Sequence, residues 1–333
     1  MPESLITTDI DFEAEGVQTG VLRVPHSHNR SAYGHIPIPI WVARRGRDPT
    51  VLMTGANHGD EYEGPVALMR FMRDFRLDRL SGRIIVIPAL NFPAYLAGTR
   101  VSPIDGVNLN RAFPGDPRGT VTEMIADYVE SVLMPMTNFC FDFHAGGSSL
   151  NYLPTLFAFR HQDAAAQARM DRLVEAFGAP RAMIMDMLGE DRVISAGARR
   201  KGVLFLTGEF GGGATINLDG LEIVRRGIEG VLDSLEVLPM REPRRSPAPI
   251  RRLVVKGAAH YLFAPVAGIF EPLFRLGDEV EAGQPAGYIH DPVQPWREPT
   301  PVAFKGSGLV LCVRTFTLVS PGDCLAHLAA DET

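Results

Sequence analysis

The sequence lacks long apolar runs, has only three cysteines and carries no block of basic residues. No apolar stretch reaches the roughly 18 residues that a membrane-spanning helix needs. Three cysteines cannot all pair with one another, and their spacing does not match a zinc knuckle. The net charge of −6, without a Lys/Arg cluster, argues against binding to a nucleic acid. We therefore expect a small molecule as the partner, and neither a nucleic acid nor a membrane.

Residues 1–15 are acidic and show neither the positively charged start nor the apolar stretch of a secretory signal. A cytoplasmic location is therefore expected. Hydrophobic residues make up 45% of the chain and charged residues 22%, which is typical of a globular protein. A length of 333 residues suits a large domain together with a smaller one.

The first two-thirds of the chain alternates between apolar runs and segments in which apolar residues recur at helical spacing. The apolar runs predict two strands within 38–56 and further strands at 83–88, 138–143 and 203–206. The helical spacing predicts helices at 64–80, 120–134, 163–177 and 219–237. This alternation predicts a layered α/β domain that closes near Val237.

The pattern changes after residues 241–249, REPRRSPAP, whose charge and proline content are typical of a linker. Beyond them, short β-rich stretches separated by Gly, Pro and Asp predict a small all-β domain, which resembles biotinyl/lipoyl-type domains. The modifiable lysine motif of those carriers is missing, so this domain is expected to shape a site or a contact in a homo-oligomer. The predicted domains are 1–240 and 250–333.

The strongest local pattern is GANHGDE, which places His58 and Glu61 three positions apart directly after a buried strand. A third ligand is expected at His144, in FDFHAGG, because open α/β sheets gather ligands at the ends of their strands. Two imidazoles and one carboxylate leave a tetrahedral position on a zinc ion for water, whose pKa coordination lowers. A lone histidine is more often structural, but the three residues together favour a metal site.

Two further acids stand near these strand ends. Asp142 precedes His144 by two positions on the same strand face and is a candidate acceptor for a hydrogen bond from that imidazole, with a helix cap or a buried ion pair as alternatives. Glu209 follows an apolar strand and precedes three glycines. It is the candidate general base, which would take a proton from water and pass it to the leaving amine. The alternative is a surface glutamate in a flexible loop.

The segment 100–111, RVSPIDGVNLNR, has an arginine at each end and two asparagines between them. The planar guanidinium of arginine suits binding of a carboxylate through two hydrogen bonds, or polarisation of a scissile carbonyl. Arginines in a loop are usually solvated. The segment therefore indicates function only in combination with the metal ligands.

Taken together, GANHGDE, DGVNLNRAFPG, FDFHAGG and GEFGGG resemble the succinylglutamate desuccinylase/aspartoacylase family, which belongs to the zinc carboxypeptidase superfamily. The motifs of this resemblance cover about residues 40–215, and the β domain also fits the family plan. The resemblance implies a zinc carboxypeptidase-like α/β fold, in which a mixed sheet has helices on both faces, with a small C-terminal all-β domain. The implied activity is zinc-dependent hydrolysis of the amide bond of a small N-acyl amino acid.

The resemblance also implies roles for individual residues. It implies one zinc ion per subunit, bound by His58, Glu61 and His144. It implies that Glu209 is the catalytic carboxylate and that Arg100 polarises the scissile carbonyl.

On the substrate side, Asn110 and Arg111 match the pair that holds the substrate carboxylate in the family. Asn108 stands where many members carry an aspartate, which puts any role of that acid in doubt. A tyrosine of the β domain contributes in some members, and both Tyr261 and Tyr288 are candidates for it here.

Within the family, VPHSHNRSAYGHIPIPI and TGANHGDEYEGPVAL are similar to one branch, the N-alpha-acetyl-L-2,4-diaminobutyrate deacetylases of ectoine degradation. This similarity implies that acetate is released from that compound. A basic substrate side chain favours an acidic pocket wall, for which the candidates are Glu63, Asp186, Glu190 and Asp191.

Three alternatives stay open. The first is desuccinylase or aspartoacylase activity on another acyl amino acid. The second is a metallocarboxypeptidase, whose zinc ligands would be the same, although the short Gly/Pro-rich loops and the added β domain favour a closed pocket for a small substrate. The third is a binding or scaffold protein that has lost catalysis, against which the presence of every expected catalytic residue argues.

Overall fold

The computed structural model of the chain describes residues 4–186, 189–240 and 249–332. Its strands are β1 (Gly16–Pro25), β2 (His35–Arg45), β3 (Thr50–Gly55), β4 (Gly82–Ile87), β5 (Phe139–His144), β6 (Leu150–Tyr152), β7 (Thr155–Phe159), β8 (Arg181–Met185), β9 (Leu204–Glu209), β10 (Arg251–Val254), β11 (Tyr261–Phe263), β12 (Gly268–Pro272), β13 (Glu279–Val280), β14 (Pro285–His290), β15 (Thr300–Ala303), β16 (Gly308–Arg314), β17 (Leu318–Val319) and β18 (Cys324–Asp331). Its α-helices are α1 (Glu63–Asp74), α2 (Phe92–Ala97), α3 (Val121–Tyr128), α4 (Ala164–Phe177), α5 (Ile194–Arg200) and α6 (Leu218–Ser234). Short 3₁₀ and π segments are η1 (Leu77–Arg79), η2 (Leu109–Arg111), η3 (Val129–Leu133), η4 (Met134–Met136) and η5 (Ala258–His260).

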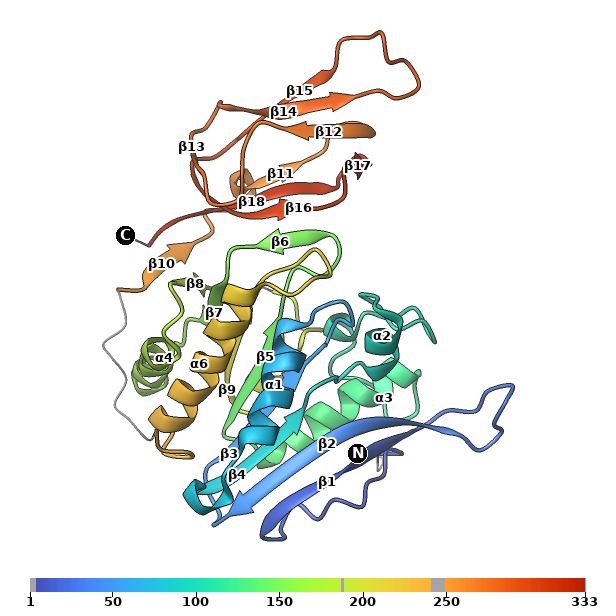
Figure 1. Cartoon of the computed structure of the whole chain (residues 1–333), viewed down its shortest axis with the longest axis vertical. Coiled ribbons are helices and arrows are strands. Elements are labelled where there is room, and N and C mark those ends of the chain that lie inside the picture. The colour runs from blue at the N-terminus through green and yellow to red at the C-terminus, as the bar shows by residue number, and fades with distance from the viewer. Residues whose placement is uncertain (1–3, 187–188, 241–248, 333) are drawn as a thin grey trace.

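The larger of the two sheets has a mixed centre. Strands β4, β3, β5 and β9 run parallel to one another, β7 is antiparallel to β9, and β8 is parallel to β7. Helices α1, α4 and α6 pack on one face in a first apolar core, and α3 and α5 pack on the other face in a second (Figure 1). The predicted mixed sheet with helices on both faces is therefore confirmed.

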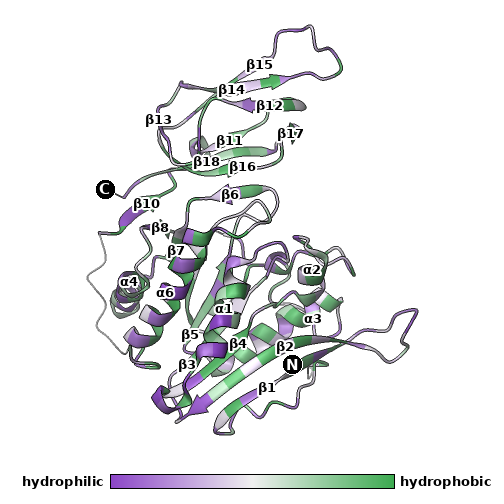
Figure 2. Ribbon diagram, viewed as in Figure 1, coloured by the Kyte–Doolittle hydropathy of each residue, from purple (hydrophilic) through white to green (hydrophobic). Residues whose placement is uncertain are grey.

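The apolar composition of the central strands follows from the helices that cover both faces of the sheet. Every residue of β3, β4 and β5 is buried. Because helices cover both faces, side chains on either face have to be apolar, so these strands are near-continuous apolar runs in the sequence. The covering helices α1 and α6 instead alternate hydrophobic and hydrophilic residues, since each has one face in water (Figure 2).

Two predicted helices are shorter than expected. The segment 64–80 is α-helical only in α1 and contains the short 3₁₀ segment η1 near its end. The two are separated at Phe75, which takes an extended conformation and packs its ring edge-on against Trp41, with ring centroids 4.9 Å apart. The segment 120–134 begins with a capping box between Thr120 and Glu123, as α3, and then continues as the π and 3₁₀ segments η3 and η4. Among the described residues, no helix combines the length and apolarity needed to cross a membrane.

The C-terminal part forms a second layered unit at one end of the molecule (Figure 1). Strands β12, β14, β15 and β17 make a separate antiparallel sheet, which shares an apolar core with β16 and β18 of the larger sheet. Strand β10 joins the two parts of the larger sheet, since it pairs with β8 on one side and β18 on the other. Residues 241–248 of the predicted linker lie outside the described residues. The division into domains 1–240 and 250–333 stays a prediction.

One strand of the α/β part is attached directly to the C-terminal part. Strand β6 pairs antiparallel with β16, so that Leu150 lies opposite Arg314 and Tyr152 opposite Cys312. The hydrogen bonds continue on both sides of this pairing, where Thr315 N–H donates to Ser149 O and Leu153 N–H donates to Leu311 O. The segment after β5 is thereby held between the two parts of the molecule.

Candidate metal centre

The predicted metal ligands follow neighbouring parallel strands. His58 lies in the loop after β3, whereas His144 is the last residue of β5. Gly55 at the end of β3 lies opposite Phe143 of β5, and His144 lies opposite Glu209 at the end of β9. All these side chains therefore emerge at the same edge of the sheet, where parallel strands end and where ligands gather in α/β folds.

Glycines allow the loops at this edge to approach one another. A Cβ at Gly59 would overlap the backbone carbonyl of Ala94, so that only glycine fits between His58 and Glu61. Gly147 has φ +58°, and a Cβ there would lie 2.8 Å from the carboxylate of Asp60. That carboxylate accepts a hydrogen bond of 2.6 Å from the backbone N–H of Ser148, which ties the two ligand-bearing loops together.

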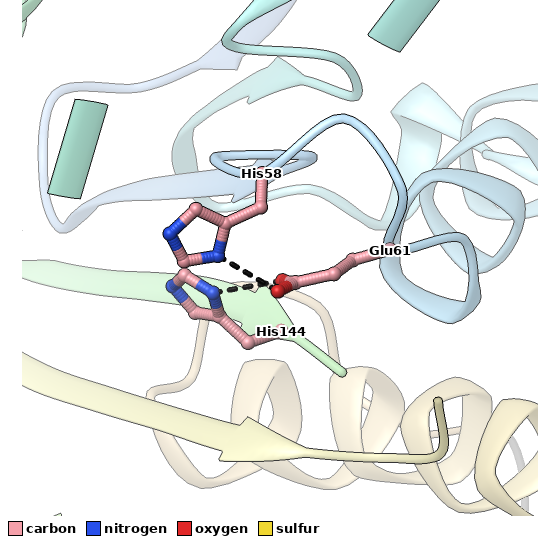
Figure 3. Close-up of side chains that lie close together, drawn as sticks. All are labelled: His58, Glu61 and His144. Atoms are coloured by element: carbon pink, nitrogen blue, oxygen red, sulfur yellow. Dashed lines mark hydrogen bonds and ion pairs between the residues drawn. The ribbon is translucent and has the colours of Figure 1, made fainter. Parts of the chain in front are cut away.

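His58, Glu61 and His144 converge on one point (Figure 3). The Nδ1 atom of His58 lies 2.7 Å from Glu61 Oε1, and the Nδ1 atom of His144 lies 2.9 Å from Glu61 Oε2. The donor atoms of the three residues lie within 4.8 Å of one another, and each residue is at most 6% exposed. The predicted convergence of these three side chains is confirmed.

Each imidazole also has an acceptor at its other nitrogen. Nε2 of His144 donates to Asp142 Oδ2 at 2.7 Å, and Nε2 of His58 donates to Asn108 Oδ1 at 3.2 Å. The orientation of the Asn108 amide is fixed, because its Oδ1 also accepts from the backbone N–H of Asn110. The hydrogen bond predicted for Asp142 is therefore present, and Asn108 takes the corresponding place at the other histidine.

This arrangement fits a divalent cation. A neutral imidazole carries one N–H, and here it is used at Nε2, so the lone pair at each Nδ1 faces a carboxylate oxygen of Glu61. The lone pairs of nitrogen and oxygen repel each other, and a second proton or a cation between the two atoms removes this repulsion. Two imidazole nitrogens and one carboxylate form a donor set that suits zinc.

The pKa shifts in the cluster also indicate that it favours a positive charge. Burial by itself raises the pKa of Glu61, but the charges of His58 and His144 outweigh it and hold the pKa well below its usual range. Burial lowers the pKa of His144, whereas the carboxylates of Asp142 and Glu61 raise it, and the net pKa lies well above the ordinary value. Buried carboxylates thus stabilise positive charge at this position.

Glu209 faces the same region with an unsatisfied oxygen. Its Oε2 is buried and has no hydrogen-bond partner among the described residues. Burial raises the pKa of Glu209 well above its usual range, and the negative charge of Glu61 raises it further. A flexible surface loop, the alternative expected from the sequence, is excluded because Glu209 ends strand β9 and pairs with β5 and β7.

A cavity of about 740 Å³ opens beside the cluster. All of the predicted site residues except Glu61 are among those that line it: His58, Arg100, Asn110, Arg111, His144 and Glu209. The structure therefore brings the whole predicted set to one place. The roles of its members in catalysis and substrate binding stay predictions.

The arginines and asparagine of the 100–111 segment approach the cluster from one side. Arg100 Nη1 lies 3.4 Å from His58 Nδ1 and 3.8 Å from Glu61 Oε1. Arg111 Nη1 donates to the backbone oxygen of Asn110, and the side-chain oxygen of Asn110 accepts from Ile194 N–H at the start of α5. Asn110 is thereby held in place while its NH₂ group makes no hydrogen bond within the described part of the chain.

The cavity also distinguishes between the two candidate tyrosines. Tyr261 lines it, whereas Tyr288 lies on the second sheet opposite Glu271 and Pro301 and is not among the described lining residues. Tyr152 and His327 line the cavity as well, although no pattern in the sequence indicated either residue.

Of the four acids predicted for the pocket wall, two line the cavity and two are not among its described lining residues. Asp186 and Glu190 line the cavity, but each has an arginine close by, at 3.3 Å for Asp186 and Arg160 and 2.9 Å for Glu190 and Arg192. Glu63 is buried under the loop that follows β9, where it accepts a hydrogen bond from Asn217 N–H, and burial raises its pKa to about 7. Asp191 pairs with Arg199, and like Glu63 it is not among the described residues that line the cavity.

Comparisons with known proteins agree with this geometry. Residues 47–235 match the model of the succinylglutamate desuccinylase/aspartoacylase catalytic domain. The chain is 39% identical to the N-alpha-acetyl-L-2,4-diaminobutyric acid deacetylase of Halomonas elongata over 98% of its own length and 95% of that protein.

Two solved structures show the same fold over almost the whole chain. The product-bound ectoine utilization protein EutE (DoeB) from Ruegeria pomeroyi has a TM-score of 0.94 at 35% identity, covering 99% of this chain and 100% of that one. A succinylglutamate desuccinylase/aspartoacylase from Rhodobacter sphaeroides has a TM-score of 0.92 at 38% identity, with the same coverage. The likeness therefore includes the C-terminal β-rich part.

Proposed function

Since the chain belongs to the succinylglutamate desuccinylase/aspartoacylase family, we propose that it is a zinc-dependent amidohydrolase that deacetylates N-alpha-acetyl-L-2,4-diaminobutyrate. The observation that carries this proposal is the buried set of His58, Glu61 and His144 at a cavity that also holds Glu209. The substrate follows from the likeness to the deacetylase of Halomonas elongata and to EutE.

The three ligands would hold one zinc ion per subunit. A zinc ion at this position supplies a Lewis acid that polarises a carbonyl and lowers the pKa of a water molecule. Asp142 and Asn108 accept hydrogen bonds from the Nε2 protons of the histidines, so that both Nδ1 lone pairs would be available to hold an ion.

Glu209 moves the proton. Its carboxylate accepts a proton from the attacking water and delivers it to the nitrogen of the leaving amine. The residue lines the cavity, where a substrate would bind. Burial raises the pKa of Glu209, which makes its carboxylate a stronger acceptor for the proton of the water.

The substrate is held by the 100–111 segment. Arg100 stabilises the negative charge that develops on the carbonyl oxygen, since its guanidinium lies beside the ligands. Arg111 and the free NH₂ group of Asn110 bind the α-carboxylate, which orients the substrate in the cavity. The proposal includes a cytoplasmic location, consistent with the free cysteines Cys140, Cys312 and Cys324, and a homo-oligomer.

The test is a substrate panel combined with metal analysis. The purified protein is expected to bind one zinc per subunit and to release acetate from N-alpha-acetyl-L-2,4-diaminobutyrate faster than it cleaves acetyl-aspartate, succinyl-glutamate or a set of peptides. Preference for acetyl-aspartate or succinyl-glutamate would indicate the other activities of the family. Preference for peptides would indicate a metallocarboxypeptidase, and no hydrolysis of any compound would indicate a protein that has lost catalysis.

A further inference from the structure

The segment 100–111 presents its functional side chains from two ends, with Arg100 at one end and residues 108–111 at the other. The residues between them form a turn, which is closed by a hydrogen bond of 3.2 Å from the backbone N–H of Ser102 to Val107 O. Because this turn joins the two ends, its position affects how they lie relative to the metal cluster and the cavity.

Asp105 lies in this turn and attaches it to helix α3. Its Oδ2 accepts a hydrogen bond of 2.8 Å from the backbone N–H of Thr122, and its Oδ1 accepts one of 2.9 Å from the Thr122 hydroxyl. Oδ1 also accepts from the backbone N–H of Val107 at 3.1 Å. One carboxylate therefore closes the turn and fastens it to a residue that is fully buried.

Helix α3 is a firm anchor for this contact. Thr122 lies in its first turn, where backbone N–H groups have no partner within the helix and favour a carboxylate. The end of the helix does not depend on Asp105, because Thr120 and Glu123 form a capping box. Removing the Asp105 carboxylate is therefore expected to release the turn without unfolding α3.

Other side chains of the turn do not replace this contact. In the described part of the chain, no other side chain of residues 101–107 makes a hydrogen bond to a helix or strand. Pro103, Ile104 and Gly106 are exposed to solvent around Asp105. The hydrogen-bonded attachment of the turn to the rest of the α/β part thus depends on Asp105.

The residue after Val107 connects the turn to the substrate-binding side chains. Asn108 is the N-cap of the short segment η2, and its side chain accepts a hydrogen bond of 2.9 Å from the backbone N–H of Asn110. Asn110 and Arg111 lie within η2 and line the cavity. Asp105 itself is not among the described residues that line the cavity. An effect of Asp105 on the substrate therefore passes through Asn110 and Arg111.

We propose that Asp105 is a positioning residue, which holds Asn110 and Arg111 in the direction that binds the α-carboxylate of the substrate. This inference rests on the proposed deacetylase function and adds to it a residue that does not touch the substrate. Selectivity for an α-carboxylate then depends on the contact between the turn and α3 as well as on the side chains that bind it. Such positioning matters, since a displacement of about 1 Å can lower a rate by about a hundredfold.

The test compares N-alpha-acetyl-L-2,4-diaminobutyrate with its α-carboxamide, in which a neutral amide replaces the carboxylate. Acetate release from both compounds is measured with zinc in excess. The wild-type protein is expected to prefer the carboxylate by tenfold to a hundredfold in kcat/KM, the range for hydrogen bonds to a charged group.

In Asp105→Ala this ratio is expected to fall about tenfold. The fall should come mainly from a higher KM for the carboxylate, because Asn110 and Arg111 hold it less well. A general loss of structure would instead lower the rates for both compounds together and leave the ratio unchanged.

The matched control is Asp116→Ala. Asp116 also precedes α3, but it is exposed, and its side chain accepts a hydrogen bond from Arg118 N–H within its own turn. This control should keep the wild-type ratio. Thr122→Val removes the hydroxyl donor and keeps the backbone N–H, so it should lower the ratio by a smaller factor than Asp105→Ala does.

The double variant Asp105→Ala/Thr122→Val tests the contact itself. Without the carboxylate the Thr122 hydroxyl has no acceptor to lose, so the ratio should equal that of Asp105→Ala alone. If Asp105→Ala does not fold, Thr122→Val and Asp105→Asn carry the test. Each of them removes only part of the hydrogen bonding, and each should still lower the ratio.

The possible failures are distinguishable. A wild-type protein that releases no acetate from N-alpha-acetyl-L-2,4-diaminobutyrate overturns the proposed function itself. An active wild-type protein that cleaves both compounds equally well, or whose ratio is unchanged in folded Asp105→Ala, overturns the positioning role. An equal fall in Asp116→Ala overturns it too, and in each of these cases the deacetylase function still stands.

Discussion

Asp142 and His144 lie two residues apart on β5 and are joined by a hydrogen bond of 2.7 Å from Nε2 to Oδ2. The carboxylate of Asp142 is itself held by the Thr54 hydroxyl at 2.6 Å and the Asn57 amide at 2.9 Å. The imidazole therefore cannot rotate away from the cluster without breaking a buried network. The other histidine, His58, has a neutral amide at the same position, so the two ligands are supported unequally.

Replacing Asp142 by asparagine is expected to weaken zinc binding. The amide occupies the same volume but accepts a weaker hydrogen bond from His144, which makes the imidazole a poorer ligand. The expected loss of affinity is about tenfold to a hundredfold. Competition against a chelator measures it, with Asp163→Asn, at the start of α4, as the control. An unchanged affinity would show that Asp142 serves only to fill the core.

The converse change, Asn108→Asp, is expected to strengthen zinc binding. A carboxylate at this position accepts a charge-assisted hydrogen bond from His58 Nε2 and also keeps the bond from the Asn110 N–H. We expect a gain of about tenfold in affinity, measured by the same competition. A loss of affinity instead would mean that the added charge disturbs Arg111 or Arg100 more than it helps His58.

Glu209→Gln is expected to keep the metal and lose most of the turnover. The amide cannot take a proton from water, so kcat should fall by about a hundredfold or more. Zinc content and thermal stability should stay close to those of the wild type, because Oε2 makes no hydrogen bond in the described structure. Glu222→Gln on the surface of α6 is the control. A near-normal rate in Glu209→Gln would remove this residue from the mechanism.

The buried His327 should make stability depend on pH. Its pKa is about 4 in the folded chain and near 6.5 in the unfolded chain, so the unfolded state binds more protons between these values. The stability that its neutral form contributes is complete above pH 6.5 and is lost as the pH falls toward 4. Between pH 7 and pH 5 the loss is on the order of 2 kcal/mol. Urea denaturation of the metal-free protein should show that this part of the pH dependence is missing in His327→Phe.

Much of the metal site could be predicted from the sequence because its signals are local. His58 and Glu61 share one loop with Gly59, and His144 and Glu209 each end an apolar strand. Parallel strands bring their ends to one edge, so the convergence follows from the fold class alone. The predicted family is confirmed, and so are the mixed sheet and the helices on both of its faces.

The residues that the sequence did not indicate depend on contacts between distant segments. Phe75, at the end of α1, is extended and packs on Trp41 of the distant strand β2. Tyr152 and His327 reach the cavity only because β6, β11, β16 and β18 assemble into one sheet. No spacing along the chain distinguishes Tyr261 from Tyr288, and pairing alone decides which of them lines the cavity.

The pairing of β6 with β16 has a consequence for the order in which the enzyme is completed during its synthesis. A chain leaves the ribosome from its N-terminus, so β3, β5 and β9 can form their sheet while Gly308–Arg314 is still inside the exit tunnel. Until β16 emerges, β6 lacks the strand that it pairs with, and the wall of the cavity that contains His327 does not exist. A nascent chain thus contains all three proposed metal ligands before the C-terminal part completes the cavity beside them.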